Sequence, residues 1–163
     1  MAGVGGEEGF NVEALRQELW VDVKHIQLRK TVNILGFDLE VDHHGLLLQS
    51  KDKVVVVHYA KDENSLRGTV VVESLERFSG KASATKPHYN MIGPNKLPIQ
   101  EVASRALSRV GEQNYDVLQN NSEHFVTSAL YGTAKSWQAE LLALMNPLVF
   151  SMNLDSIQRV VAM

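Results

Sequence analysis

The chain has 163 residues, of which 44% are hydrophobic and 21% are charged, a composition typical of one water-soluble globular domain. Sixteen Lys and Arg residues against nineteen Asp and Glu residues give a net charge of −3, without the dense basic surface on which nucleic-acid affinity depends. The sequence contains no cysteine, which excludes disulfides, thiolate metal sites and a thiol nucleophile.

The chain begins with a glycine-rich, acidic lead over residues 1–10, which we expect to be flexible. It lacks the basic and apolar blocks of a secretory signal, so we expect a cytoplasmic protein. A short helix or turn is predicted over residues 12–19, with Asn11 as its N-cap.

Short β-branched runs follow between Trp20 and about Glu76, and this pattern indicates strands. The polar turn 50–53 predicts a hairpin between two of them. The candidate strands cover residues 21–26, 35–41, 45–49, 54–59 and 69–75. We therefore expect an antiparallel sheet of four to six strands.

Residues 79–98 are rich in glycine and proline and are predicted to form a loop. Apolar residues at offsets 0, 3, 4, 7, 8 and 11 from Ile99 then predict a helix over residues 99–110 that stops at Gly111. A second helix is predicted from Asn121 or Ser122 to about Gly132. The expected fold class is α+β, with both helices packed on one side of the sheet.

The last segment, residues 136–163, is predicted to be an apolar helical tail beyond a domain at residues 11–135. Its most apolar part, residues 141–154, is interrupted by Asn146 and Pro147 and is shorter than the ~20 apolar residues of a transmembrane helix. The residues allow two roles for this tail: packing against the sheet, or contact with a membrane surface or a protein partner.

Three of the six histidines, His43, His44 and His58, lie in or beside neighbouring candidate strands. A histidine on one strand that is oriented by a histidine on the next can act as a general base. Strand histidines also occur as half-buried packing residues, and the residues alone leave both interpretations open. Because no HExxH motif and no cysteine are present, we expect neither a metal site nor a cofactor.

The second predicted helix begins in the segment Asn120-Asn121-Ser122-Glu123-His124-Phe125. Asn121 or Ser122 can serve as the N-cap of this helix. Alternatively, a Ser122 nucleophile would benefit there from the free N–H groups and the dipole of the helix N-terminus.

Residues 115–126 resemble the Asn-Cys-Glu-His-Phe box of the lecithin:retinol acyltransferase-like family, with Ser122 in the place of the nucleophilic cysteine. Arg105-Ala106 followed by Gly111, and Tyr131-Gly132, resemble the segments that flank this box. The run His43-His44-Gly45 and the strand that ends at His58 resemble the two histidine strands of the family. The resemblance covers about residues 31–132.

The resemblance implies a circularly permuted, NlpC-type papain-like fold and acyl transfer from phospholipids through a covalent acyl-enzyme. It assigns His43 as the general base, with His44 as the alternative, His58 as the residue that polarises the base, and Ser122 as the nucleophile. It also implies a lipid acyl donor at a membrane surface, with Asn121 orienting the loop and the Ser122 N–H group helping to hold the oxyanion.

The family also includes picornaviral H-box/NC proteins, so the resemblance allows a second function: a non-catalytic interaction protein on the same scaffold, with a protein partner bound through residues 141–152. A serine hydroxyl stays protonated where a cysteine would become a thiolate, so we expect Ser122 to be a weak or inactive nucleophile.

Overall fold

The computed structural model describes residues 9–34, 37–61, 67–80, 82–86 and 95–145. Its described strands form one antiparallel sheet in the order β1-β2-β3-β4, so that each strand pairs with the next along the chain. The strands are β1 (Trp20–Ile34), β2 (Phe37–Ser50), β3 (Val54–Lys61) and β4 (Gly68–Glu73). The fold is α+β, as the sequence predicts.

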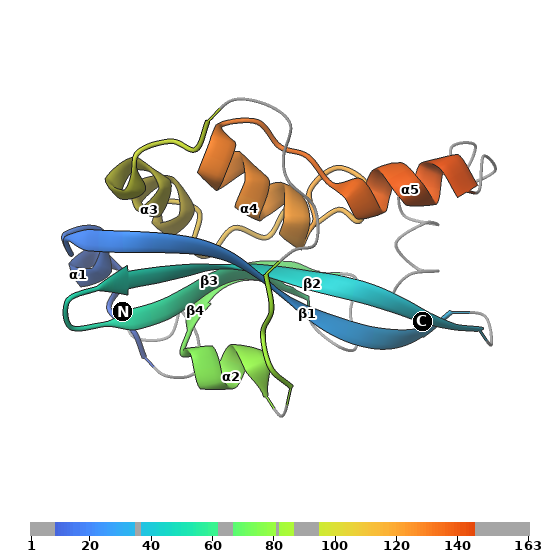
Figure 1. Ribbon diagram of the computed structural model, residues 1–163, viewed down its shortest axis with the longest axis horizontal. Helices are drawn as coiled ribbons and strands as arrows, with labels where there is room; N and C mark the ends of the chain where they lie inside the picture. The colour runs from blue at the N-terminus through green and yellow to red at the C-terminus, as the bar shows by residue number, and fades with distance from the viewer. Residues whose placement is uncertain (1–8, 35–36, 62–66, 81, 87–94, 146–163) are drawn as a thin grey trace.

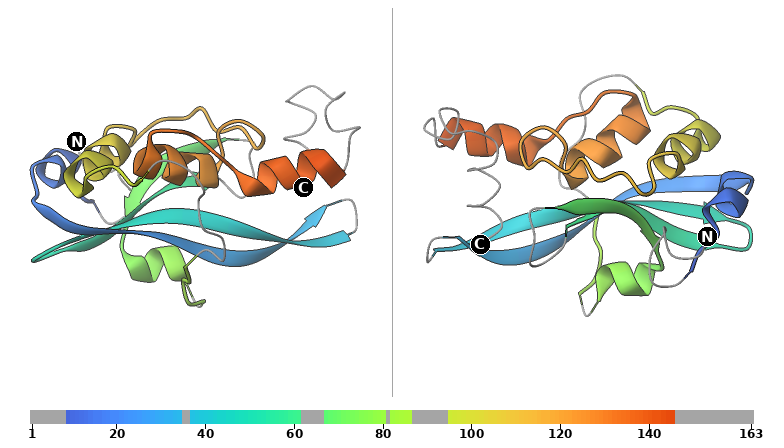
Figure 2. Two further views of the ribbon diagram at one scale, coloured as in Figure 1. Left: turned by 45° about the horizontal axis from the view of Figure 1, so that its top comes forward. Right: turned by 180° about the vertical axis from the view of Figure 1, so that it is seen from behind.

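Helices cover both faces of this sheet (Figures 1 and 2). Helices α3 (Ile99–Leu107), α4 (Ser122–Tyr131) and α5 (Trp137–Met145) lie on one face, whereas the short helix α2 (Leu75–Ser79) lies on the other. Helix α1 (Val12–Arg16) packs beside α3 at the start of β1. The prediction that the two central helices share one side of the sheet is therefore confirmed.

Each face of the sheet has its own apolar core because successive strand residues point to opposite faces. The larger core lies under α3 and α4 and includes Leu46, Leu48, Val57 and Phe125. The smaller core lies under α2 and is formed by Ile26, Leu28, Leu47, Val56 and Phe78. Adjacent residues of β2 therefore face different cores, so its two histidines, His43 and His44, lie on opposite faces of the sheet.

Several helix boundaries agree with the sequence pattern. Asn11 caps α1, whose regular turns end at Arg16 rather than at residue 19. Helix α4 begins at Ser122 and ends at Tyr131. Its C-cap is Gly132, which adopts the left-handed φ of 77° that glycine tolerates best. Helix α3 starts at Ile99 as predicted but ends at Leu107. The chain then turns through residues 108–111, and Gly111 adopts a φ of 93°.

Three strand predictions are wrong in detail. Residues 21–26 are only the first part of β1, which runs from Trp20 to Ile34. Residues 35–41 and 45–49 were expected to be separate strands, but residues 37–50 form the single strand β2. The polar residue Asp42 does not end the strand, because Arg29, which pairs with it on β1, binds the Asp42 carboxylate at 3.1 Å. The strand expected to reach residue 75 ends at Glu73 because Ser74 caps α2 by accepting a hydrogen bond from Arg77 N.

None of the helices in the described part of the chain has the length and apolar character needed to cross a bilayer. Residues 146–163, which contain the remainder of the predicted tail and its expected last helix, lie outside the described residues.

Gly45 packs closely against Phe78 of α2. A methyl group at this position would lie 2.9 Å from Phe78 Cζ and 2.9 Å from Val56 Cγ1, closer than atoms can approach without a shift. We expect Gly45→Ala to lower the free energy of unfolding by about 1–3 kcal/mol through overpacking of this core. Urea denaturation measures this change, and adding Phe78→Leu should restore part of the loss. An unchanged unfolding midpoint would contradict the tight packing.

Candidate active site at the start of helix α4

The N-terminus of α4 is fixed by a reciprocal cap. Asn121 Oδ1 accepts hydrogen bonds from Glu123 N at 2.9 Å and His124 N at 3.0 Å, while His124 Nδ1 accepts one from Asn121 N at 3.1 Å. The Asn121 amide also donates to Val117 O and to Ser136 Oγ. Of the two capping residues that the sequence allows, Asn121 is the cap, so the Ser122 hydroxyl is left for other contacts.

Ser122 lies in the first turn of α4 and faces strand β2. Its Oγ atom accepts a hydrogen bond of 3.1 Å from the backbone N–H of His44, which is 78 residues away in the sequence. The serine is 7% exposed and His44 is 1% exposed, so this contact is shielded from water. The sheet and the helix thus bring together two of the residues that the sequence singles out.

The His44 ring is held by hydrogen bonds at both of its nitrogens. His44 Nδ1 lies 2.7 Å from His25 Nε2, on the neighbouring strand β1, and His44 Nε2 lies 3.0 Å from Gln138 Nε2, at the start of α5. His25 is also buried. His25 from strand β1 and Gln138 from helix α5 therefore orient the His44 ring.

The Gln138 amide determines the tautomer of His44. Gln138 Oε1 accepts a hydrogen bond of 2.8 Å from Asp42 N, and Gln138 Nε2 donates one of 2.6 Å to Asp42 O. These two bonds fix which end of the amide is nitrogen, so Gln138 Nε2 must be the donor toward His44 Nε2. The neutral His44 ring therefore carries its proton on Nδ1 and donates it to His25 Nε2.

Burial keeps both histidines neutral. It lowers the pKa of His25 to about 3, and repulsion from His44 and Lys96 acts in the same direction. Burial also lowers the pKa of His44, against the opposing attraction of Glu123 and Asp42. A neutral imidazole can accept a proton, so the His44 ring is in the state that a general base requires.

The depressed pKa of His25 makes the stability of the fold depend on pH. Between about pH 6.5 and pH 3 the unfolded chain binds a proton at this residue and the folded chain does not, so stability falls as pH falls. We expect a slope of up to about 1.4 kcal/mol per pH unit from this residue. Urea denaturation at pH 7, 6 and 5 should show that His25→Gln makes this dependence shallower. The same slope in the variant and the parent would contradict the neutral buried state of His25.

Glu123 lies directly beside Ser122 and is fully buried. Its Oε1 atom accepts hydrogen bonds from Ser136 Oγ at 2.8 Å and from Gln138 N at 3.2 Å, and its Oε2 atom lies 3.8 Å from His44 Nε2. The carboxylate joins the start of α5 to the start of α4. Glu123 thus also places Gln138.

His43 and His58 lie on the opposite face of the sheet, beside α2. His43 Nε2 is 2.8 Å from His58 Nδ1, and His58 Nε2 is 3.1 Å from Glu73 Oε2. Both rings pack against Phe78, with centroid distances of 5.7 Å and 4.9 Å. The expected pair of histidines forms, but the alternation of β2 directs it away from the face that carries Ser122.

The structure therefore differs from the arrangement that the resemblance implies. It places His44, the alternative base, beside Ser122, and it places His25 rather than His58 behind the His44 ring. Sequence reasoning missed His25 and Gln138. The signal for His25 is present, because it lies in the alternating run 21–26, whereas Gln138 lies 12 positions beyond the recognisable box 115–126 and has no local signal.

This arrangement holds a hydroxyl at a helix N-terminus, next to the backbone of a histidine whose ring is neutral and buried. The Ser122 Oγ atom accepts from the His44 backbone, whereas both His44 ring nitrogens bind other side chains. In the described part of the chain, no group of three or more His, Asp or Glu side chains is placed to hold a metal ion. The chemistry that these residues can perform is proton transfer and nucleophilic attack, after His44 Nε2 exchanges Gln138 for the nucleophile.

Comparison with known proteins gives a consistent result. A family model described as lecithin retinol acyltransferase matches residues 25–135, which include the strands and helix of the site. The chain is 38% identical over 71 residues to phospholipase A and acyltransferase 1 of Rattus norvegicus, which covers 43% of this chain and 38% of that protein. It is 32% identical over 102 residues to lecithin retinol acyltransferase of Mus musculus, covering 58% and 44%, respectively. The matches thus span less than half the length of these two relatives.

Proposed function

The chain belongs to the lecithin retinol acyltransferase family, and from this premise we propose that it provides an acyl-transfer site for phospholipids with Ser122 in the nucleophile position. In this proposal the sheet and its helices form the circularly permuted, NlpC-type fold that the resemblance implies. The names of the relatives, a phospholipase and acyltransferase and a lecithin acyltransferase, support a lipid ester as the acyl donor.

The observation that carries the proposal is the contact between the start of α4 and strand β2. Ser122 Oγ lies 3.1 Å from His44 N, in a buried site where His25 orients the His44 ring. A nucleophile in the first turn of a helix, next to a base that is itself oriented by a third side chain, is the usual arrangement for covalent acyl transfer. All three residues lie within the segment that matches the family.

The proposed reaction has two steps. In the first, the nucleophile at position 122 passes its proton to His44 Nε2 and attacks the ester carbonyl carbon, and the lysophospholipid leaves with that proton. The oxyanion that forms is stabilised by the Ser122 N–H group, which points out of the helix N-terminus. In the second step, water or an amine passes a proton to His44 and attacks the acyl carbonyl carbon. The bond to the nucleophile at position 122 then breaks, the nucleophile regains its proton from His44, and a fatty acid or an amide is released.

We assign the base to His44 in place of His43, the first candidate from the sequence. His44 is supported by its position beside Ser122, while the ring of His43 binds His58 on the α2 face. His58 then has no part in the reaction, and its bond to Glu73 serves the packing of α2. Asn121 remains a positioning residue through its cap of α4.

The serine makes this site weak as it stands. A hydroxyl keeps its proton near neutral pH, whereas a thiol with a pKa of ~8.5 is readily converted to a thiolate beside a histidine. The His44 ring also accepts no hydrogen bond from Ser122 Oγ, because Nδ1 donates to His25 and the lone pair of Nε2 accepts from Gln138. We therefore expect slow acyl transfer or none from the protein with Ser122.

The proposal is tested by replacing the nucleophile. Ser122→Cys is incubated with phosphatidylcholine vesicles, and the intact protein mass is measured. We expect a mass increase of one acyl group that hydroxylamine removes, because a thioester forms at position 122 and a lysophospholipid is released.

Ser104→Cys is the matched control. Ser104 is exposed on α3, so this variant carries a thiol that lies outside the candidate site. It should gain no acyl group, and neither should Ser122→Ala. A folded Ser122→Cys protein that stays unmodified would refute the acyl-transfer proposal.

One observation favours a second function, a non-catalytic interaction protein on the same scaffold. Both ring nitrogens of His44 are bonded to side chains other than Ser122, which is an arrangement suited to a structural histidine. If this is the function, the Ser122→Cys protein will remain unmodified, whereas changes in residues 141–145 will weaken binding of a protein partner. Residues 146–152 of this expected contact lie outside the described residues.

We also propose that the protein meets its lipid substrate as a peripheral protein at a membrane surface. Trp137, Leu141 and Leu144 are spaced to share one side of α5, and all three are exposed. Lys135 Nζ lies 4.1 Å from the centre of the Trp137 ring. An aromatic ring, a nearby cation and an apolar stripe suit the interface between water and lipid, and the same helix contacts the site through Gln138.

A further inference from the structure

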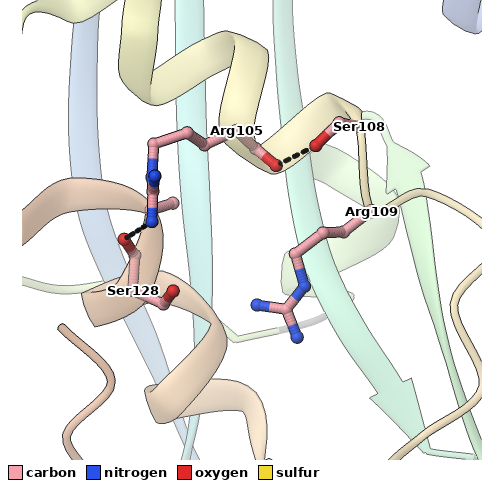
Figure 3. Close-up of a pocket in the computed structure, with 5 residues that line it drawn as sticks. Arg105, Ser108, Arg109 and Ser128 are labelled. Atoms are coloured by element: carbon pink, nitrogen blue, oxygen red, sulfur yellow. Dashed lines mark hydrogen bonds between the residues drawn. The ribbon is translucent and has the colours of Figure 1, made fainter. Parts of the chain in front are cut away.

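A pocket of about 200 Å³ lies between helices α3 and α4 (Figure 3). It is lined by Arg105, Ser108 and Arg109 from the end of α3 and the turn after it, and by Ser128 and Ala129 from α4. One water molecule occupies about 30 Å³ in the liquid, so the pocket has room for a tetrahedral oxyanion and several waters. Its lining residues take no part in the proposed acyl transfer.

Arg105 presents an unbalanced charge to this pocket. Its Nη2 atom donates a hydrogen bond of 3.1 Å to Ser128 O, which holds the guanidinium against α4. Among the residues that the structure describes, Arg105 has no carboxylate partner, and its Nε atom is buried without a hydrogen-bond acceptor. An anionic acceptor that enters the pocket would supply the charge partner that Arg105 lacks.

Arg109 is held rigidly beside the pocket. Its Nε and Nη2 atoms donate to the two carboxylate oxygens of Glu112 at 3.0 Å and 2.7 Å, and Nη2 also donates to Asn120 Oδ1. The guanidinium lies over the Phe125 ring, 4.9 Å from its centre. These contacts use Nε and Nη2, and within the described residues Nη1 makes no hydrogen bond.

The two serines add hydroxyl groups to this positive lining. Ser108 Oγ donates its proton to Arg105 O at 2.8 Å, so its position is fixed. Two guanidinium groups against the single carboxylate of Glu112 leave the pocket with a net charge of about +1, before any ligand binds. Planar guanidinium groups match the oxygen atoms of phosphate in charge and geometry, which makes arginine a preferred residue for phosphate recognition.

We propose that the α3–α4 pocket binds a phosphate group, either free in solution or in the headgroup of a phospholipid. Arg105 supplies the charge that lacks a partner, and Arg109 supplies a prealigned second guanidinium. The binding does not depend on chemistry at Ser122, so it can be tested in the unaltered protein whether or not acyl transfer occurs.

The test is a titration with inorganic phosphate, followed by amide NMR chemical shifts and by calorimetry. Sodium chloride at matched ionic strength is the reference, because it removes general screening effects. We expect saturable shifts in residues 105–109 and 128–129 of the unaltered protein, a result that needs no variant. Shifts that do not saturate, or that spread evenly over the surface, would overturn the proposal.

Two variants then test the charge. Arg105→Gln should weaken phosphate binding at least tenfold, whereas Lys24→Gln removes one exposed positive charge on strand β1 and should leave the affinity within about twofold. If the two changes weaken phosphate binding equally, the net charge of the protein alone accounts for the affinity, and the proposed site is overturned.

Vesicles distinguish the two sources of phosphate. Co-sedimentation with vesicles of phosphatidylcholine and phosphatidic acid that both Arg105→Gln and added inorganic phosphate weaken identifies the lipid headgroup. Saturable phosphate binding without such co-sedimentation identifies free phosphate. Vesicle binding that Arg105→Gln does not change, in a protein that binds no inorganic phosphate, would overturn the proposal.

Discussion

Replacing His44 with alanine in the Ser122→Cys background is expected to lower kcat/KM for phospholipid hydrolysis or transfer by about 100- to 10,000-fold, the usual contribution of a general base. His44 lies on the face of β2 that contacts Ser122, and burial keeps its ring neutral. Removal of the imidazole leaves the thiol without a proton acceptor. The measurement is release of lysophospholipid from vesicles at pH 7 to 8.

His43→Ala in the same background is the matched control, because it removes the neighbouring imidazole from the opposite face of the same strand. We expect it to leave kcat/KM nearly unchanged. Circular dichroism should confirm that both variants are folded at the assay temperature. A large loss of activity from His43→Ala with little loss from His44→Ala would refute the assignment of the base and restore the order that the resemblance implies.

Replacing Phe125 with alanine is expected to lower the free energy of unfolding by about 3–5 kcal/mol. Phe125 is fully buried in the first turns of α4, where its ring lies 6.2 Å from the ring of Tyr59 and under the guanidinium of Arg109. The change removes a large side chain from a packed core and leaves a cavity between α4 and the sheet. Urea denaturation measures the loss directly.

For a chain of this length, that loss corresponds to a decrease in Tm of roughly 6–20 °C, at about 2–4 °C per kcal/mol. Leu144→Ala is the control, since Leu144 is 80% exposed on α5, and it should change the free energy of unfolding by less than about 0.5 kcal/mol. Similar losses from the two changes would contradict the central position of Phe125 in the core.

The sequence predicted the elements whose ends carry strong local signals. Asn121 and Gly132 bound α4 at the expected positions because a capping side chain and a left-handed glycine are properties of a few adjacent residues. Helix α2 was missed because its five residues follow a β-branched strand directly, without an apolar period of their own. The long strand β2 was divided in two because cross-strand partners, which bind the side chain of Asp42 and the ring of His44, are invisible in a local pattern.

The candidate site was predictable in part. The box around Ser122 predicted the start of α4, where we propose the nucleophile, and the histidines predicted a strand that lies within β2. Strand alternation predicts that His43 and His44 point to opposite faces of the sheet, but it does not predict which of the two faces α4. That choice depends on how β2 packs against the helices, which is a property of the whole fold.

The hydrogen bond from Gln138 to His44 brings a residue from outside the family match onto the proposed base. Gln138 lies three residues beyond the segment shared with the family, yet its amide occupies the lone pair with which the imidazole would act. In the proposed reaction, a residue outside the matched segment thus controls the lone pair of the base. Two proteins with the same strands and the same nucleophile helix would then differ in rate according to what the following helix places over one ring nitrogen.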